Sequence, residues 1–220
     1  MKVDQLHNDC DLESYTDAYE AFSRKCKSKI FSVSKTVKTY VALNLSTAYI
    51  NAGNYQAAGE VLAGVRYFSK NRTGVMYQFF YHNNYFVYYI RTNHIHAAEE
   101  TLGRMKLLMQ SKKLRKKEKE TFSAIYAEKK RLLQMEKGDY SDCQQVFEKA
   151  YKEADRTIGK VSYQYTLGKI YLHDGKIAEA EAAFTYAAEN GGTSVYKKQA
   201  LEQLEALGKP LFVPEEPNHG

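Results

Sequence analysis

The chain has 220 residues, with 32 Lys and Arg against 26 Asp and Glu, a formal net charge of +6 and an isoelectric point near 9.0. This length can bury a core without disulfide bonds or a metal. The three cysteines are far apart and form no paired metal motif, which favours a reducing compartment. No apolar run reaches the roughly 18 residues of a membrane span, and the polar first residues do not have the pattern of a secretory signal. We therefore expect a cytoplasmic protein without a membrane span.

Proline is almost absent until the end of the chain, where Pro210, Pro214 and Pro217 stand. Leucine, alanine, lysine and glutamate occur throughout, and these residues have high helix propensity. The composition therefore predicts an all-α protein.

The first predicted helix covers residues 11–29, with one apolar face formed by Leu12, Tyr15, Ala18, Phe22 and Cys26. It has the pattern of the second helix of a hairpin whose first helix is missing. Either it caps the fold, or the chain is a piece of a longer protein. We expect a disordered end before this helix, and we assign residues 1–35 to an N-terminal tail and capping helix.

The next stretch, STAYINAGNYQAAGEVL (46–62), places a glycine between two amphipathic runs. Gly53 can end the first helix in a left-handed conformation, and Asn54 can cap the second. Two helices joined by so short a loop lie antiparallel. The stretch therefore predicts a helical hairpin.

The same turn recurs three times when Gly53, Asn93, Gly138 and Gly175 are placed in register. Five residues after each turn stands a small side chain: Ala58, Ala98, Cys143 and Ala180. Nine residues after it stands a large one: Leu62, Leu102, Phe147 and Phe184. A small position followed by a large one suits close crossing of helices. The spacings between turns are 40, 45 and 37 residues, as the four positions give them.

These copies resemble the tetratricopeptide repeat, and the fourth, LGKIYLHDGKIAEAEAAFTYAA (167–188), is the most similar. The family repeats every ~34 residues, so the spacing here is long, and the family's tryptophan and late proline are missing. The resemblance implies a right-handed superhelical array of antiparallel hairpins over residues 36–190. Residues 191–220 then form a C-terminal capping helix and a mobile tail.

The resemblance also implies that the first helix of each hairpin lines a concave face. Nine residues before the turns stand Asn44, Asn84 and Lys129, and two residues before them stand Asn51 and Arg91. Asparagine amides can hold a peptide backbone, and the two cations can attract a carboxylate. Some proteins of this family hold peptide C-termini with asparagine and lysine at matching positions. The alternative, that these polar residues merely face water, stays open.

A strongly aromatic stretch, YQFFYHNNYFVYYI (77–90), belongs to the second hairpin. Aromatic residues at helical spacing are most often core. A helix that is aromatic nearly all round, however, is buried on both sides or meets a partner. Tyr81 and Tyr88 are therefore candidate contact residues, for a partner protein or for a second copy in a homodimer.

The run KKLRKKEKETF (112–122) carries the densest positive charge. A nucleic-acid surface over 112–131 is one interpretation, but Glu118 and Glu120 interrupt the run. We expect a solvated loop and first helical turn here, and no nucleic-acid partner.

No catalytic or phosphate-binding motif is present. His94 and His96 do not share one face of a helix, and His7 with Cys10 could hold a metal only with partners that the sequence does not show. We therefore expect no cofactor, no metal and no enzymatic activity. The expected function is a non-catalytic scaffold that binds a protein or peptide on its concave face. The ligand-binding part of a peptide-sensing regulator is the alternative.

Overall fold

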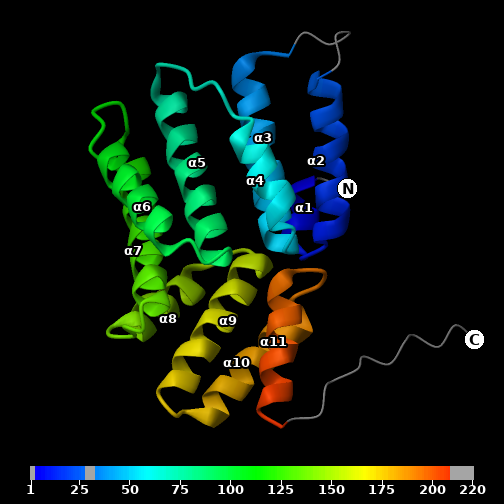
Figure 1. Ribbon diagram of the computed structural model, residues 1–220, viewed down its shortest axis with the longest axis vertical. Coiled ribbons are helices and arrows are strands. Elements are labelled where there is room, and N and C mark those ends of the chain that lie inside the picture. Colours follow the sequence, from blue (N-terminus) through cyan, green and yellow to red (C-terminus); the bar gives the residue numbers. More distant parts are fainter. Residues whose placement is uncertain (1–2, 28–32, 209–220) are drawn as a thin grey trace, which may run out of the picture.

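The computed structural model describes residues 3–27 and 33–208, which form eleven α-helices and no strand (Figure 1). The helices are α1 (Val3–Asn8), α2 (Leu12–Lys27), α3 (Lys35–Ala52), α4 (Tyr55–Ala63), α5 (Arg72–Arg91), α6 (Ile95–Met109), α7 (Lys116–Glu136), α8 (Cys143–Glu153), α9 (Thr157–His173), α10 (Ile177–Asn190) and α11 (Val195–Ala206). Each helix packs against its neighbours in sequence, as expected for a helical repeat. The prediction of an all-α protein is confirmed.

All four predicted turn residues have a left-handed backbone. Their φ angles are 81° for Gly53, 59° for Asn93, 84° for Gly138 and 73° for Gly175. After the first turn, the Asn54 side chain accepts a hydrogen bond from the Ala57 amide at 3.2 Å and so caps α4. The first helix of each hairpin therefore ends at its aligned turn. The second helix begins two residues after the turn in three hairpins, at Tyr55, Ile95 and Ile177, whereas α8 begins at Cys143, five residues after Gly138.

The positions in register after each turn form the core. The small residues Ala58, Ala98, Cys143 and Ala180 are completely buried, and so are Leu62 and Phe184 at the large position. Gly168 on α9 makes room for one of these rings, because a Cβ on Gly168 would lie 2.5 Å from Phe184. The glycine at position 168 of the fourth copy is thus explained by the packing of α9 against α10.

The ends of the described chain meet, and the contact involves a polar clasp formed by Cys10, Leu12, Gly192 and Thr193. The Thr193 hydroxyl accepts hydrogen bonds from the Leu12 amide at 2.8 Å and the Glu13 amide at 3.3 Å, so it caps α2 from the far end of the chain. The Thr193 amide donates to the Cys10 carbonyl at 3.0 Å. Further contacts join α1 to α9 and α11 to α3. The N-terminal helices and the last hairpin therefore close on each other.

The expected disordered end before residue 11 is wrong for the part that the structure describes. Residues 3–8 form α1, and Leu6 and Cys10 are buried in the core. The clasp explains this order, because it ties the N-terminal residues to the distant Gly192 and Thr193. The local sequence does not reveal this contact. The predicted mobile tail lies in 209–220, outside the described residues. Within 3–27 and 33–208, no helix is both long enough and apolar enough to cross a bilayer.

Candidate functional site

Asn84 does not face an open groove as predicted. Its side chain is 6 % exposed, and its amide nitrogen donates to the Leu43 carbonyl, the Ser46 hydroxyl and the Thr47 hydroxyl at 2.9 to 3.0 Å. These bonds join α5 to α3. Asn84 is therefore a structural residue, because α3 engages its NH2 group and Asn83 donates to its side-chain oxygen at 3.3 Å.

The other two predicted asparagines lie on α3 and are partly exposed. Asn44 donates to the Tyr40 carbonyl one turn earlier at 2.9 Å. The Asn51 amide lies 3.2 Å from Nε2 of His7 on α1. The N-terminal helix therefore covers part of the face on which Asn51 was expected to meet a ligand.

Arg91 and Lys129, from α5 and α7, line one small cavity of about 60 Å³. The predicted register thus brings two cations from successive hairpins to the same place. The remaining walls come from α9 and α11 and include Ser162, Thr166 and Tyr196. We call this space the cation cavity.

The positive charges of the cation cavity are poorly compensated. The Arg91 guanidinium lies over the Tyr196 ring at 5.3 Å and donates to the Gln199 side chain at 3.4 Å. Among the described residues it forms no ion pair. Lys129 lies 4.0 Å from the carboxylate of its neighbour Glu128, at the limit of an ion pair. The cavity therefore holds a guanidinium with neutral partners and an ammonium with a distant one.

The carboxylate that lines the cation cavity, Glu136, is already engaged. It lies 3.2 Å from the Lys169 ammonium, and both side chains are about one-third exposed. The Lys129 side chain is less accessible, at 16 %. The Glu136–Lys169 pair is thus more open to solvent and contributes no net charge.

The hydroxyl of Tyr196 responds to the two cations. Burial acts to raise the pKa of Tyr196, but the charge of Arg91, a hydrogen bond with Ser162 and the charge of Lys129 outweigh it and lower the pKa. The hydroxyl of the nearby, half-buried Tyr55 is itself buried and has no hydrogen-bond partner among the described atoms. Burial raises the pKa of Tyr55, and the positive charge of Arg91 partly offsets this increase. The electrostatic environment of the cavity therefore favours negative charge.

A carboxylate matches this site in charge and in hydrogen bonding. A guanidinium offers several N–H donors in a planar fork, an ammonium offers three, and both pair strongly with carboxylates. The low polarity of a small, partly enclosed cavity strengthens such a pair. The sequence pointed to Arg91 and Lys129, but not to Tyr196 or Ser162. These two are contributed by helices whose position depends on how the whole array curves.

The tyrosines of α5 pack on one another and on α4 and its loop. Tyr81 contacts the edge of Phe68 at 5.3 Å and Tyr85 at 4.9 Å. Tyr88 covers Gly59 of α4, where a Cβ would lie 3.1 Å from the ring. Both predicted contact residues, Tyr81 and Tyr88, are half-buried. Part of each ring is thus used inside the fold.

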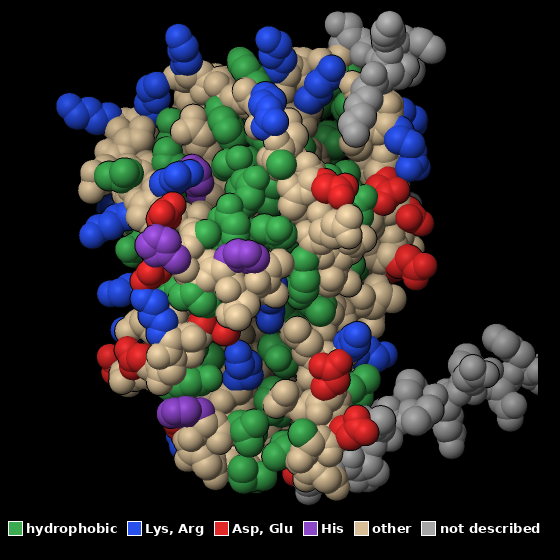
Figure 2. Space-filling model, in the orientation of Figure 1, with side chains coloured by type: hydrophobic (Ala, Val, Ile, Leu, Met, Phe, Trp, Pro, Cys, Tyr) green, Lys and Arg blue, Asp and Glu red, His purple; other side chains and the backbone are tan. Residues whose placement is uncertain are grey.

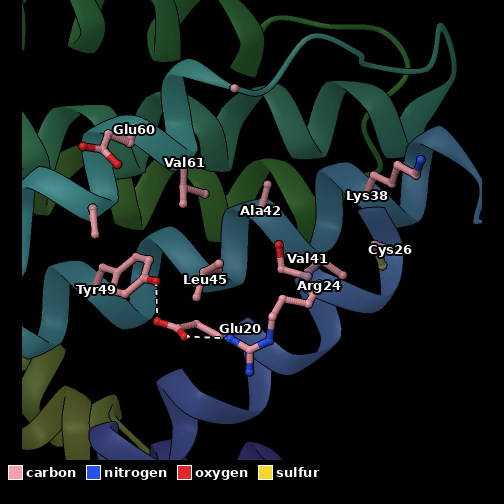
Figure 3. A pocket seen from close by; sticks show the side chains of 13 residues that line it. Glu20, Arg24, Cys26, Lys38, Val41, Ala42, Leu45, Tyr49, Glu60 and Val61 are labelled. Carbon is pink, nitrogen blue, oxygen red and sulfur yellow. Dashed lines mark hydrogen bonds and ion pairs between the residues drawn. The ribbon is translucent and has the colours of Figure 1, made fainter. Parts of the chain in front are cut away.

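A second hollow, a groove of about 560 Å³, lies between α2, α3 and α4 (Figure 3). Val41, Leu45 and Val61 give it an apolar lining. Glu20 accepts a 2.6 Å hydrogen bond from the Tyr49 hydroxyl and lies 3.2 Å from the Arg24 guanidinium. The Glu20 carboxylate therefore has its partners, in contrast to the two cations of the cation cavity.

Metal ligation and thiol chemistry find no support in the described residues, where no cluster of three His, Cys, Asp or Glu side chains forms. Cys10 is buried, and burial followed by the charge of Asp9 raises its pKa to about 11. His94 hydrogen-bonds to Thr92 beside the turn, and His96 lies near Glu99 and Glu100 on the surface of α6.

Comparison with known proteins adds no relative: no family model, no curated protein and no solved structure matches the chain.

Proposed function

We propose that this chain is a non-catalytic scaffold that binds a partner protein or peptide through an acidic group. In this proposal the helices form a right-handed, tetratricopeptide-like array. The partner's carboxylate, at a C-terminus or on an Asp or Glu side chain, enters the cation cavity between Arg91 and Lys129.

The observation that carries the proposal is the unbalanced charge of that cavity. Burying a charge without a partner costs free energy, and a ligand carboxylate offsets that cost. A preformed site on packed helices also binds with little loss of conformational freedom. The small volume limits the buried part of the ligand to about a carboxylate and its neighbouring atoms.

The ligand-binding part of a peptide-sensing regulator is the second form of this proposal. Its recognition chemistry is the same, since a free peptide also presents a terminal carboxylate. The two forms differ in whether the ligand is a free signal or the end of a partner protein. Sequence preference beyond the last residues of the ligand separates them.

The test is a display screen of peptides with free C-termini on the wild-type chain, followed by affinity measurement of the selected peptides. Each peptide is measured with a free and with an amidated C-terminus. Lys129→Gln removes one cation while keeping a polar side chain of similar length. We expect it to weaken binding by at least about tenfold, in line with the loss of one charge-assisted hydrogen bond.

Lys130→Gln is the matched control, because Lys130 is the next residue on α7 and is exposed. It changes the net charge equally and leaves the cavity intact. Equal loss of affinity in both variants contradicts the proposal. So does an affinity that depends neither on a free C-terminal carboxylate nor on acidic side chains in the peptide. Absence of any selected peptide also contradicts it, provided that the protein is folded.

A further inference from the structure

Positive charge is concentrated at one end of the molecule, in three segments that are distant in sequence. These segments are residues 35–38 (KTVK), 66–72 (RYFSKNR) and 112–119 (KKLRKKEK). Together they contain eleven Lys or Arg residues and one acidic residue, a formal charge of +10. Since the whole chain carries +6, the remainder carries −4. We call the three segments the basic end.

Contacts between the segments show that they form one surface. The Lys113 ammonium donates to the Lys70 carbonyl, and Arg72 pairs with Glu118 at 2.9 Å. The Lys35 ammonium lies 5.6 Å from the Tyr67 ring. In Figure 2, Lys and Arg side chains gather along the top of the visible face, where α3 and α5 begin in Figure 1. The N-terminal ends of α3, α5 and α7 belong to these segments and add partial positive charge.

Exposed apolar side chains lie within the same surface. Six large hydrophobic side chains are exposed in the described part of the chain, and four of them, Val37, Tyr40, Tyr67 and Leu107, lie in the three segments of the basic end or within five residues of them. Val37 is 37 % exposed and Tyr67 is 39 % exposed. Leu107, in the last turns of α6, is 68 % exposed and is the most exposed of the six. Exposure of such side chains to water is unfavourable, and their transfer to an apolar environment lowers the free energy.

We infer that the basic end binds the surface of an anionic phospholipid bilayer. Clusters of lysine and arginine bind acidic headgroups, and neighbouring apolar side chains insert at the boundary of headgroup and acyl chain. The only acidic residue of the three segments, Glu118, is engaged by Arg72 and by the Arg115 amide. The cations without such a partner are mostly lysines, whereas nucleic-acid recognition prefers arginine. This inference stands independently of the cation cavity, which lies near the opposite ends of α5 and α7.

The test is co-sedimentation of the chain with vesicles of phosphatidylcholine, with and without about 30 % phosphatidylserine, at low salt. We expect binding only to the anionic vesicles, and a steep loss as salt increases because screening weakens the attraction. Neutralising four lysines, Lys112, Lys113, Lys116 and Lys117, to Gln is expected to weaken partitioning by at least about 30-fold. Leu107→Ser is expected to weaken it by about fivefold without changing its salt dependence.

A charge-matched control replaces four exposed lysines outside the basic end by Gln: Lys130, Lys149, Lys152 and Lys198. We expect this variant to keep most of the vesicle binding. Equal loss in both variants overturns the inference, because net charge alone then explains the attraction. Failure to bind anionic vesicles overturns it too. Tighter binding to duplex DNA than to vesicles at equal phosphate concentration assigns the surface to nucleic acid instead.

Discussion

Asn84 and Arg91 lie on the same helix, about two turns apart. The Asn84 side chain is buried, whereas the Arg91 side chain is partly buried and lines the cation cavity. Asn84 donates to three acceptors on α3 at 2.9 to 3.0 Å. Arg91 has the Tyr196 ring and the Gln199 amide oxygen as its partners, and no carboxylate among the described residues. The first side chain completes a network within the fold, whereas the second leaves a charge for which the fold supplies no counter-charge.

This difference distinguishes a polar side chain that stabilises the fold from one that is available to bind a ligand. A buried polar group that is fully hydrogen-bonded stabilises one packing arrangement. A buried charge without a counter-ion costs stability, and a ligand that supplies the counter-ion offsets this cost. The two residues were predicted together as groove residues, because they stand nine and two residues before the turn at Asn93 and both register positions were expected on the concave face. Only the local partners distinguish them.

The largest expected effect on stability comes from substitution of Asn84. Asn84→Ala removes a buried donor that bonds the Ser46 and Thr47 hydroxyls and the Leu43 carbonyl, so the two hydroxyls lose the donor that they accept from. We expect a loss of about 2–3 kcal/mol in the free energy of unfolding, measured by urea denaturation. Unchanged stability would show that this contact is not structural. Affinity for selected peptides is expected to change little as long as the protein remains folded.

His82, on the same helix, is expected to make stability depend on pH. Burial, followed by the charge of Arg104, lowers its pKa to about 4 from an ordinary value of 6.5. Because the folded-state pKa is below the unfolded one, this contribution is fully present above pH ~6.5 and is lost as pH falls towards ~4. The full shift corresponds to about 3 kcal/mol, and since solvent screens the half-buried side chain we expect roughly 2 kcal/mol. His82→Gln removes this contribution, so the difference between the two unfolding profiles should shrink on acidification; a constant difference contradicts the assignment.

Thr193 is expected to have a smaller effect, through the clasp that joins the two ends of the described chain. Thr193→Val keeps the size of the side chain but removes the hydroxyl that caps α2. Loss of a helix cap costs about 1 kcal/mol, and we expect that decrease in thermal or urea unfolding. Thr185→Val is a control in the neighbouring α10, where the side chain is half-buried and makes no clasp contact. Similar losses of stability in both variants would mean that the Thr193 hydroxyl does not stabilise the fold by capping α2.

The smallest effect on stability is expected at Arg91 itself. Arg91→Met replaces a charge without a counter-ion by an apolar side chain of similar length. Replacing buried charge with packed apolar atoms is often neutral or stabilising, so we expect a loss below about 0.5 kcal/mol, or a gain. Binding of acidic peptides should nevertheless fall. A loss as large as that of Asn84→Ala would place Arg91 among the structural residues.

The sequence predicted the local parts of the fold well. Gly53, Asn93, Gly138 and Gly175 are left-handed turn residues, and the positions in register after them are buried. These features depend on backbone conformation and on helical periodicity, which are local properties. The sequence also revealed the basic run at 112–119, but it did not predict that residues 35–38 and 66–72 lie beside this run in the fold.

The parts that could not be predicted depend on contacts between distant segments. Thr193 caps α2 across a separation of about 180 residues, and Tyr196 reaches Arg91 from the last helix. Both contacts result from the way the array closes, and the repeat pattern carries no information about that closure. For the same reason the sequence could not show that α1 covers Asn51, or that α3 engages Asn84.

The most direct measurement of the central claim is an NMR titration of the side-chain Nε–H signal of Arg91, assigned with Arg91→Met. The titrants are acetate and its neutral counterpart acetamide. We expect acetate to shift the Arg91 signal and the Tyr196 ring signals in a saturable way, and acetamide to leave both unchanged. Lys129→Gln should weaken the acetate response, and Lys130→Gln should not. An Arg91 signal that ignores acetate, or that responds equally to acetamide, would contradict the assignment of the cation cavity as a carboxylate site.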